Sequence, residues 1–178
     1  MKLETDRLEI VAEDLKLARA AVEGREALAE QLKASVPAEW PPEVMADAVG
    51  YWIPQLEKQP DLLGWAAWHI IRKQDRVVIG GAGFFGLTNK GQAEVGYAIL
   101  PSSQRQGYAT ESLKALVAWA FADARVDQIL GETFRELVAS IRVMERIGFA
   151  LLGEANTSHD GEKNVVQYVL SREAWEKS

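Results

Sequence analysis

The first sixty residues predict one strand followed by helices. Polar and apolar residues alternate over Arg7–Val11, which is typical of a half-buried strand. Asp14 has the side chain of a helix cap, and the apolar spacing after it predicts a helical region over Leu15–Leu32 that is broken near Gly24. After a proline-rich loop, a further helix is predicted over Pro42–Lys58, because proline is favoured in the first turn of a helix.

The remaining residues predict strands that are interrupted by two helices. Six apolar or alternating runs predict strands, and they are Trp65–Arg72, Val77–Phe85, Ala93–Leu100, Gln128–Thr133, Phe149–Gly153 and Val165–Ser171. Helical spacing of apolar residues predicts helices over Tyr108–Ala124 and Leu137–Ile147, the second ending at Gly148. This order predicts an α/β fold with one domain covering residues 1–178, in which an antiparallel meander leads into a β-α-β crossover with two parallel strands.

Composition and charge narrow the class of partner. Apolar residues make up 48% of the chain and charged residues 26%, which is typical of a soluble globular protein. The 20 lysines and arginines stand against 26 acidic residues, so the net charge is −6. Because there is also no basic run, no nucleic-acid partner is expected. A negative surface favours cationic partners, and amines are cations at neutral pH.

The residue types that are missing exclude other classes. The sequence has no cysteine, which removes disulfides, thiolate metal sites and cysteine nucleophiles, and no metal site is expected. No apolar run approaches the roughly 18 residues needed to cross a membrane. The first residues also contain no apolar signal segment. These features predict a cytoplasmic protein without a membrane partner.

The segment between the strand that ends at Pro101 and the helix that begins at Tyr108 carries the candidate chemistry. The first amides of a helix lack internal partners, and a loop of free amides before them forms a cradle for anions. Gly107 lets the backbone approach a bulky phosphate, Ala109 keeps the next contact small, and Arg105 adds a charge. The pattern fits a pyrophosphate site, but it also fits an ordinary turn before a helix cap.

Three motifs in this order resemble those of the GNAT acetyltransferase superfamily. The motif Gln104-x-x-Gly-x-Ala resembles its coenzyme A loop, which has Gln or Arg, two residues, Gly, one residue, and Gly or Ala. The run Glu94–Ile99 resembles the fourth strand of that family, and Ala139–Phe149 resembles its fourth helix with the glycine stop. The sequence Gly107-Tyr-Ala-Thr-Glu and the opening Glu4–Leu8 are similar to sequences of the Rim-type branch, which contains the ribosomal-protein N-terminal acetyltransferases and their relatives.

The resemblance implies a fold and a cofactor. The fold would be a mixed, mostly antiparallel sheet with helices on both faces, in which the parallel fourth and fifth strands splay apart. The cofactor would be acetyl-CoA, whose pantetheine would pair with the backbone of Ile99 and Leu100 in the gap. Its pyrophosphate would lie on the residues of the loop and the helix start, namely Gln104, Arg105, Gln106, Gly107, Tyr108, Ala109 and Thr110.

The resemblance also implies that an amine attacks the thioester directly, so a base and an acid are needed. Glu94 is the candidate base, because burial beside the cofactor gap would raise its pKa; the alternative is a solvated glutamate at a strand end. Glu132 is the second choice. Many family members have an acidic tyrosine where this sequence has Met144. The resemblance to Rim-type relatives implies instead that Ser140, the serine of the Ala-Ser-Ile-Arg run, is the acid, with a local helix cap as its alternative role.

Three functions follow from these readings. The first is acetyl transfer to a primary amine, either a protein N-terminus or a small molecule, by an enzyme that could form a homodimer. The second is an acyl-CoA-binding sensor with little transferase activity. Loss of the tyrosine at Met144, and of an asparagine usual in Rim-type relatives at Leu137, would accompany such a role. The third is a phosphate-binding α/β protein unrelated to coenzyme A.

Overall fold

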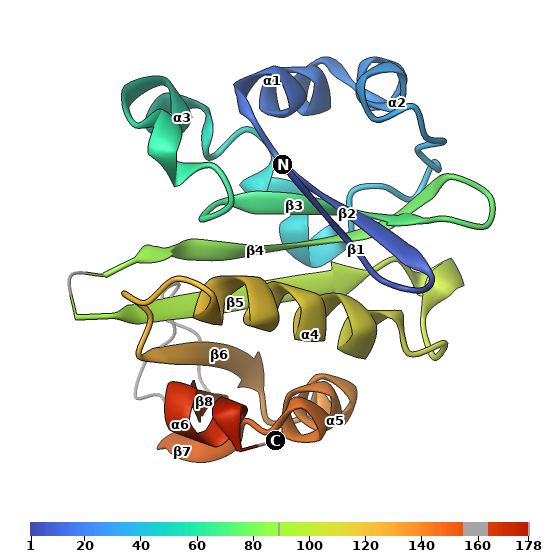
Figure 1. The fold of residues 1–178 in the computed structure, drawn as a ribbon. Helices are drawn as coiled ribbons and strands as arrows, with labels where there is room; N and C mark the ends of the chain where they lie inside the picture. Colours follow the sequence, from blue (N-terminus) through green and yellow to red (C-terminus); the bar gives the residue numbers. More distant parts are fainter. Residues whose placement is uncertain (89, 155–163, 178) are drawn as a thin grey trace. The chain divides into compact units, whose positions relative to one another are not determined.

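The computed structural model describes residues 1–88, 90–154 and 164–177. Within these residues the strands form an eight-stranded sheet in the order β1-β2-β3-β4-β5-β6-β8-β7 (Figure 1). β5 and β6 are parallel, whereas β1–β2, β2–β3, β3–β4, β6–β8 and β7–β8 are antiparallel pairs. The α/β class and the mixed, mostly antiparallel sheet that contains a parallel pair of strands are therefore confirmed.

The elements have the following bounds. The strands are β1 (Lys2–Glu4), β2 (Leu8–Ala12), β3 (Ala67–Arg72), β4 (Val77–Leu87), β5 (Gln92–Ile99), β6 (Gln128–Phe134), β7 (Ala150–Glu154) and β8 (Val165–Ser171). The α-helices are α1 (Leu15–Glu23), α2 (Arg25–Leu32), α3 (Ile53–Lys58), α4 (Tyr108–Phe121), α5 (Val138–Ile147) and α6 (Arg172–Glu176).

The chain forms two compact units. The first consists of Met1–Phe84 with Tyr97–Ala115, and the second of Phe85–Gly96 with Leu116–Ser178. The single domain expected for residues 1–178 stays a prediction. The division matters for function because the predicted cofactor residues lie in the first unit, whereas Glu94 and Ser140 lie in the second.

In the first unit, α1 and α2 contribute to a core that strands β3 and β4 complete. Buried side chains meet there from helices, strands and the loop between them, and they include Leu17, Leu28, Leu32, Trp40, Ile71, Val78 and Leu100. The predicted cap is confirmed, since the Leu17 amide donates to Asp14 Oδ1 at 2.9 Å. The predicted break is confirmed as well, because Gly24 separates α1 from α2 with a φ of 140°.

The helix predicted over Pro42–Lys58 is wrong in its middle. The structure has a 3-10 turn over Glu43–Ala48 and then the short helix α3. Gly50 lies between them with a φ of 78°, a left-handed conformation that interrupts a right-handed helix.

The run from Gly81 to Gly86 has the Gly-x-Gly-x-x-Gly spacing of dinucleotide-binding loops. It lies inside β4, so it does not form the strand-to-helix turn that such loops need.

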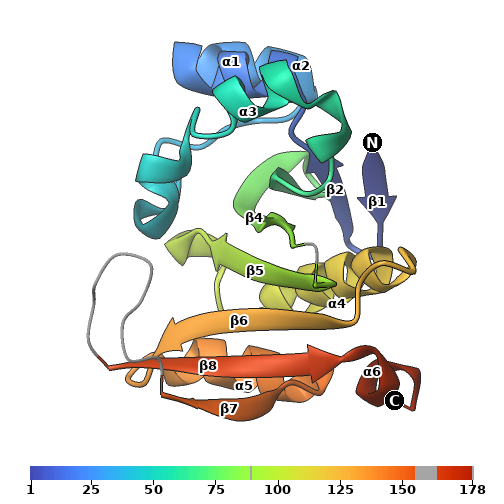
Figure 2. The same cartoon turned by 90° about the vertical axis from the view of Figure 1, so that its left-hand side faces the viewer.

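In the second unit, β8 lies between β6 and β7 with α5 across one face of the sheet (Figure 2). The predicted strand Val165–Ser171 is β8, and Gly148 ends α5 with a φ of 108° as expected. Residues 155–163, between the last two predicted strands, lie outside the described residues. Two short elements, β1 and α6, were not predicted.

Candidate functional site

The loop of residues 104–110 connects a 3-10 turn after β5 to the start of α4, and it lies wholly in the first unit. Arg105 and Gly107 have left-handed φ values of 60° and 83°, one on each side of Gln106. Within the described part of the chain, the amides of residues 105–110 have no hydrogen-bond partner. Free amides in alternating conformations at a helix start make an anion-binding concavity.

Some backbone groups beside this loop already have hydrogen-bond partners. The Leu100 amide donates to Ile79 O on β4 at 2.8 Å, so it is engaged with the neighbouring strand. The Ile99 carbonyl accepts from Gln104 Nε2 at 2.9 Å. Gly80 allows the strands to approach closely there, because a Cβ on it would lie 2.2 Å from Ala98 O. Of the two predicted pantetheine contacts, the Leu100 amide and carbonyl and the Ile99 carbonyl thus already have partners within the chain.

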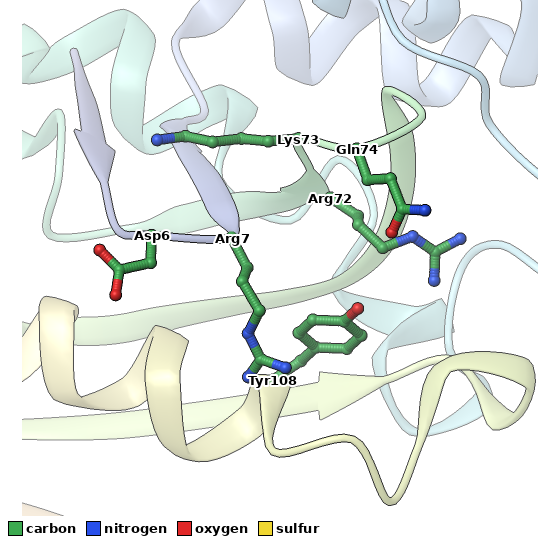
Figure 3. A pocket seen from close by; sticks show the side chains of 6 residues that line it. All are labelled: Asp6, Arg7, Arg72, Lys73, Gln74 and Tyr108. Carbon is green, nitrogen blue, oxygen red and sulfur yellow. The ribbon is translucent and has the colours of Figure 1, made fainter.

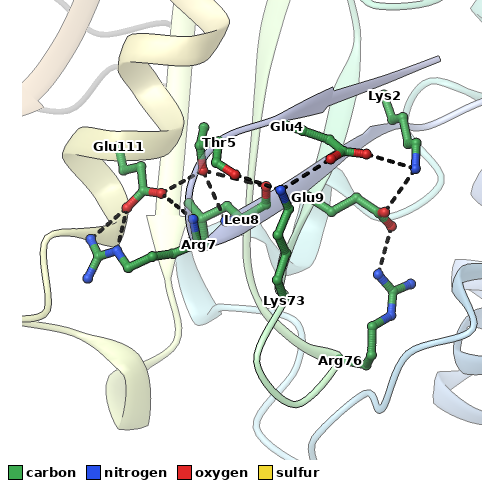
Figure 4. Close-up of polar contacts among 9 residues, drawn as sticks. All are labelled: Lys2, Glu4, Thr5, Arg7, Leu8, Glu9, Lys73, Arg76 and Glu111. Carbon is green, nitrogen blue, oxygen red and sulfur yellow. Dashed lines mark hydrogen bonds and ion pairs between the residues drawn. The ribbon is translucent and has the colours of Figure 1, made fainter.

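Side chains from the turn between β1 and β2 contact Glu111 in the first turn of α4 (Figure 4). Arg7 Nε and Nη2 pair with Glu111 Oε2 at 2.7 and 2.6 Å, and Arg7 Nη1 donates to Gln106 O at 3.0 Å. The guanidinium also lies over the Tyr108 ring, 4.6 Å from its centroid. Sequence reasoning noted the opening run that contains Arg7 but assigned it no contact.

A surface pocket of about 310 Å³ opens beside Tyr108 (Figure 3). Three of its six lining residues are cations, but each of them is already paired. Arg72 binds Asp75 through two hydrogen bonds of 2.9 and 2.7 Å, and Lys73 donates to Thr5 O at 2.6 Å and pairs with Glu4. The third, Arg7, is held by Glu111. The pocket is therefore built from ion pairs rather than from free positive charge.

In the second unit, Glu94 is half-buried on β5, between the buried and the solvated positions that the sequence left open. It lies in register with Leu130, and residues in register share a face of the sheet. Glu132 lies two residues farther along β6 on that face, where its carboxylate accepts from Gln167 Nε2 at 2.5 Å. The parallel ladder ends at the next pair, Val95 with Gly131, although β5 and β6 both continue beyond it.

The remaining predicted catalytic residue, Ser140, is half-buried in the first turn of α5, and its amide donates to Leu137 O at 2.9 Å. Leu137 is 48% exposed and offers no side-chain cap to the helix. Met144 is buried, and a Cβ placed on Gly131 would lie 2.7 Å from its sulfur. Met144 therefore fills space against β6 and has no acidic proton to offer.

Sequence reasoning also missed a buried polar pair in the first unit. Glu13 and His69 are each 5% exposed and lie 2.9 Å apart, from carboxylate oxygen to Nε2. The two residues are 56 positions apart in the sequence, and neither belongs to a motif, so no sequence pattern indicated the contact. The described residues contain no cluster of three potential metal ligands, and none of their helices could span a membrane.

Comparisons with known proteins assign the family. The model of the acetyltransferase (GNAT) domain matches residues 10–150. The N-acetyltransferase YjdG of Bacillus subtilis is 30% identical over 150 residues, which cover 84% of this chain and 89% of that protein.

Solved structures agree on the fold. The ribosomal-protein α-N-acetyltransferase RimL, in complex with coenzyme A, has a TM-score of 0.68 at 19% identity, covering 98% of this chain and 99% of that chain. The microcin C7 self-immunity acetyltransferase MccE, in complex with acetyl-CoA and AMP, has a TM-score of 0.64 at 17% identity, covering 94% and 93%. The chain, whose described residues present free amides over 105–110, therefore belongs to the GNAT family of acetyl-CoA-dependent acetyltransferases.

Proposed function

We propose that this enzyme transfers the acetyl group of acetyl-CoA to a primary amine, either a protein N-terminal α-amine or the amine of a small molecule. The observation that carries the proposal is that the amides of residues 105–110, at the start of α4, have no partner among the residues that the structure describes. A pyrophosphate offers the negative oxygens that such amides bind. The Arg105 side chain is exposed beside it and adds a permanent positive charge.

The chain's own groups have separate tasks in this proposal. The amides of the 104–110 loop hold the phosphates, and the Ile99 backbone orients the pantetheine arm. When bound, acetyl-CoA supplies a thioester carbonyl that is open to attack. Glu94, directly or through a water, accepts the proton that the attacking amine loses, and Ser140 donates a proton to the departing sulfur. Glu132 is the second candidate for the base.

The acidity of the acceptor favours an α-amine over a lysine side chain. An α-amine has a pKa of about 7.7–8.0, whereas lysine has one near 10.4. At pH 7 roughly a tenth of α-amines are therefore neutral and able to attack, against fewer than about one lysine in a thousand. A carboxylate such as the half-buried Glu94 is a modest base, which suits the more acidic amine.

A second candidate function is an acyl-CoA sensor with little transfer activity. Its supporting observation is Met144, which is buried against Gly131 where many relatives have a tyrosine acid. An acetyl-transfer screen against peptides and small amines, read by intact mass, distinguishes the two functions. Product with any amine supports the enzyme, whereas acetyl-CoA binding without product over the whole panel supports the sensor.

The variant Gly107→Glu tests the cofactor site itself. It places bulk and a negative charge where the phosphates must approach, so we expect coenzyme A binding to be abolished in calorimetry. Gly86→Glu is the matched control, because Gly86 has nearly the same φ, 84° against 83°, and open space around its Cβ position. Both variants carry the same backbone strain. Unchanged affinity in Gly107→Glu would show that the loop does not hold the phosphates.

A further inference from the structure

We propose that Arg7 and Glu111 form a clasp that holds the 104–110 loop in the conformation that binds phosphate, an inference that rests on the proposed function. Arg7 belongs to the turn between β1 and β2, and Glu111 to the first turn of α4 (Figure 4). Both residues lie in the first unit, and neither was a predicted contact of the cofactor. We assign them a positioning role rather than a catalytic one.

The clasp acts on the peptide bond before Gly107. Arg7 Nη1 donates to the Gln106 carbonyl at 3.0 Å. In a planar trans peptide, the carbonyl and the following N–H point in opposite directions. Holding the Gln106 carbonyl towards Arg7 therefore turns the Gly107 N–H away from it, to the side that is free to receive an anion. The contact of the guanidinium with the Tyr108 ring fixes the chain just after the same peptide bond.

Glu111 orients the arginine for this task. Its carboxylate is 18% exposed and receives Nε and Nη2 of Arg7, the Arg7 amide at 3.0 Å, and the Thr5 hydroxyl at 2.5 Å. With two nitrogens of the planar fork on Glu111, Nη1 is left for the Gln106 carbonyl. Lysine has no such fork and cannot make both contacts with fixed geometry.

Arg7 and Glu111 also neutralise each other's charge beside the anion site. A carboxylate in the first turn of a helix is attracted by the same partial positive charge that attracts a phosphate. Burial by itself would raise the pKa of Glu111, but the hydrogen bonds from Thr5 and Arg7 and the charge of Arg7 hold that pKa below its ordinary value. Glu111 is thus ionised at neutral pH, and Arg7 neutralises a charge that would otherwise repel the cofactor.

These two roles predict an order of affinities that a simple loss of stability would not produce. Arg7→Gln frees the loop and leaves Glu111 as an unpaired anion, so we expect the Kd for coenzyme A to rise about tenfold, as for loss of a charge-assisted hydrogen bond. Glu111→Gln frees Arg7 without adding repulsion and should weaken binding less. The double variant removes the repulsion and should bind more tightly than Arg7→Gln alone.

The experiment is calorimetry with coenzyme A on the wild type, the two single variants, the double variant and Arg7→Lys. Arg19→Gln is the matched control, because Arg19 pairs with Glu57 through a contact of 2.7 Å in the same unit and does not touch the loop. Thermal unfolding of every variant confirms that it is folded. With the amine that a screen identifies, the KM for acetyl-CoA should rise in Arg7→Gln while kcat changes little.

Each outcome bears on the clasp. The expected order, with Arg7→Lys between the wild type and Arg7→Gln, supports it. A folded Arg7→Gln protein with wild-type affinity, or a double variant weaker than Arg7→Gln, overturns the clasp and leaves the proposed function intact. A wild type that does not bind coenzyme A would overturn both, and the Gly107→Glu comparison would then show no difference either.

Discussion

Met144 cannot donate a proton, so the proposed reaction needs another side chain as its acid. Its sulfur occupies the space that any side chain at position 131 would need, and it is only 1% exposed. A phenol at position 144 would add volume to this packed core, which resists it. The acid in the proposed reaction is therefore assigned to Ser140, which provides the one hydroxyl between Leu137 and Gly148 in the sequence.

Glu94 is the residue on which the proposed reaction depends most directly. If its carboxylate accepts the amine proton, Glu94→Gln should lower kcat by roughly 10²–10⁴ at saturating substrates, as removal of a general base does. The affinity for acetyl-CoA should change little, because the 104–110 loop is untouched. Steady-state kinetics with Glu132→Gln as the paired variant identify the base. A Glu94→Gln enzyme with wild-type kcat would transfer the role to Glu132 or to solvent.

Among the elements, α1 begins at a residue whose function in the fold can be isolated. The exposed Asp14 accepts from the Leu17 amide and satisfies one of the free donors of the helix. Asp14→Ala should lower the free energy of unfolding by about 1 kcal/mol, measured by urea denaturation. Asp14→Asn keeps an acceptor of the same shape and should retain most of that stability. Equal losses in both variants would mean that charge, not capping, stabilises α1.

The same comparison shows which elements a sequence can predict. Asp14 and Gly148 act through their immediate neighbours, so local chemistry was enough to predict the start of α1 and the end of α5. Gly50 breaks a helix through its backbone conformation, which competes with the helical pattern around it and was not foreseen. β1 has three residues and depends on pairing with β2, which a short alternating run does not reveal.

In the candidate site, too, features set by neighbouring residues could be predicted from the sequence, whereas contacts made only by folding could not. The free amides that the structure describes over residues 105–110 could be expected from the sequence, because the start of a helix is set by consecutive residues, whereas the anion site itself stays a prediction. The contact between Arg7 and Glu111 was not, because the two residues are 104 positions apart and only folding brings them together. Nor could the sequence show that the Leu100 amide is engaged with Ile79, since both hydrogen-bonded and free backbone are compatible with the same side chains.

At the scale of the whole molecule, the net charge is −6, and the fold stabilises several carboxylates in their ionised form. Hydrogen bonds from Arg72 hold the pKa of Asp75 below its ordinary value. Hydrogen bonds from the Arg125 side chain and amide lower the pKa of Asp123 to about 2. Carboxylates whose pKa is lower in the folded state than in the unfolded state stabilise the fold above the unfolded value, and this contribution disappears in acid.

Acid should therefore destabilise the protein in a defined window. The free energy of unfolding should fall as the pH drops below the ordinary values of 4.5 for glutamate and 3.8 for aspartate, and continue falling towards pH 2. Urea denaturation of the wild type and of Glu111→Gln across this range measures it. The difference between the two proteins should shrink as the pH falls through the folded pKa of Glu111. A constant difference would contradict the assigned direction.

Arg172 makes the hydrogen bonding at the end of α4 depend on residues that are synthesised much later. Its guanidinium donates to the carbonyls of Phe121, Asp123 and Val126 at 2.6–2.9 Å, and these carbonyls lie at and beyond the end of α4. Arg172 follows Phe121 by 51 positions, and β8, the strand just before it, is the partner of β7. During synthesis, the carbonyls after α4 and the β8-facing edge of β7 therefore bond to water until Arg172 and β8 have been added, so this part of the second unit completes its hydrogen bonds late.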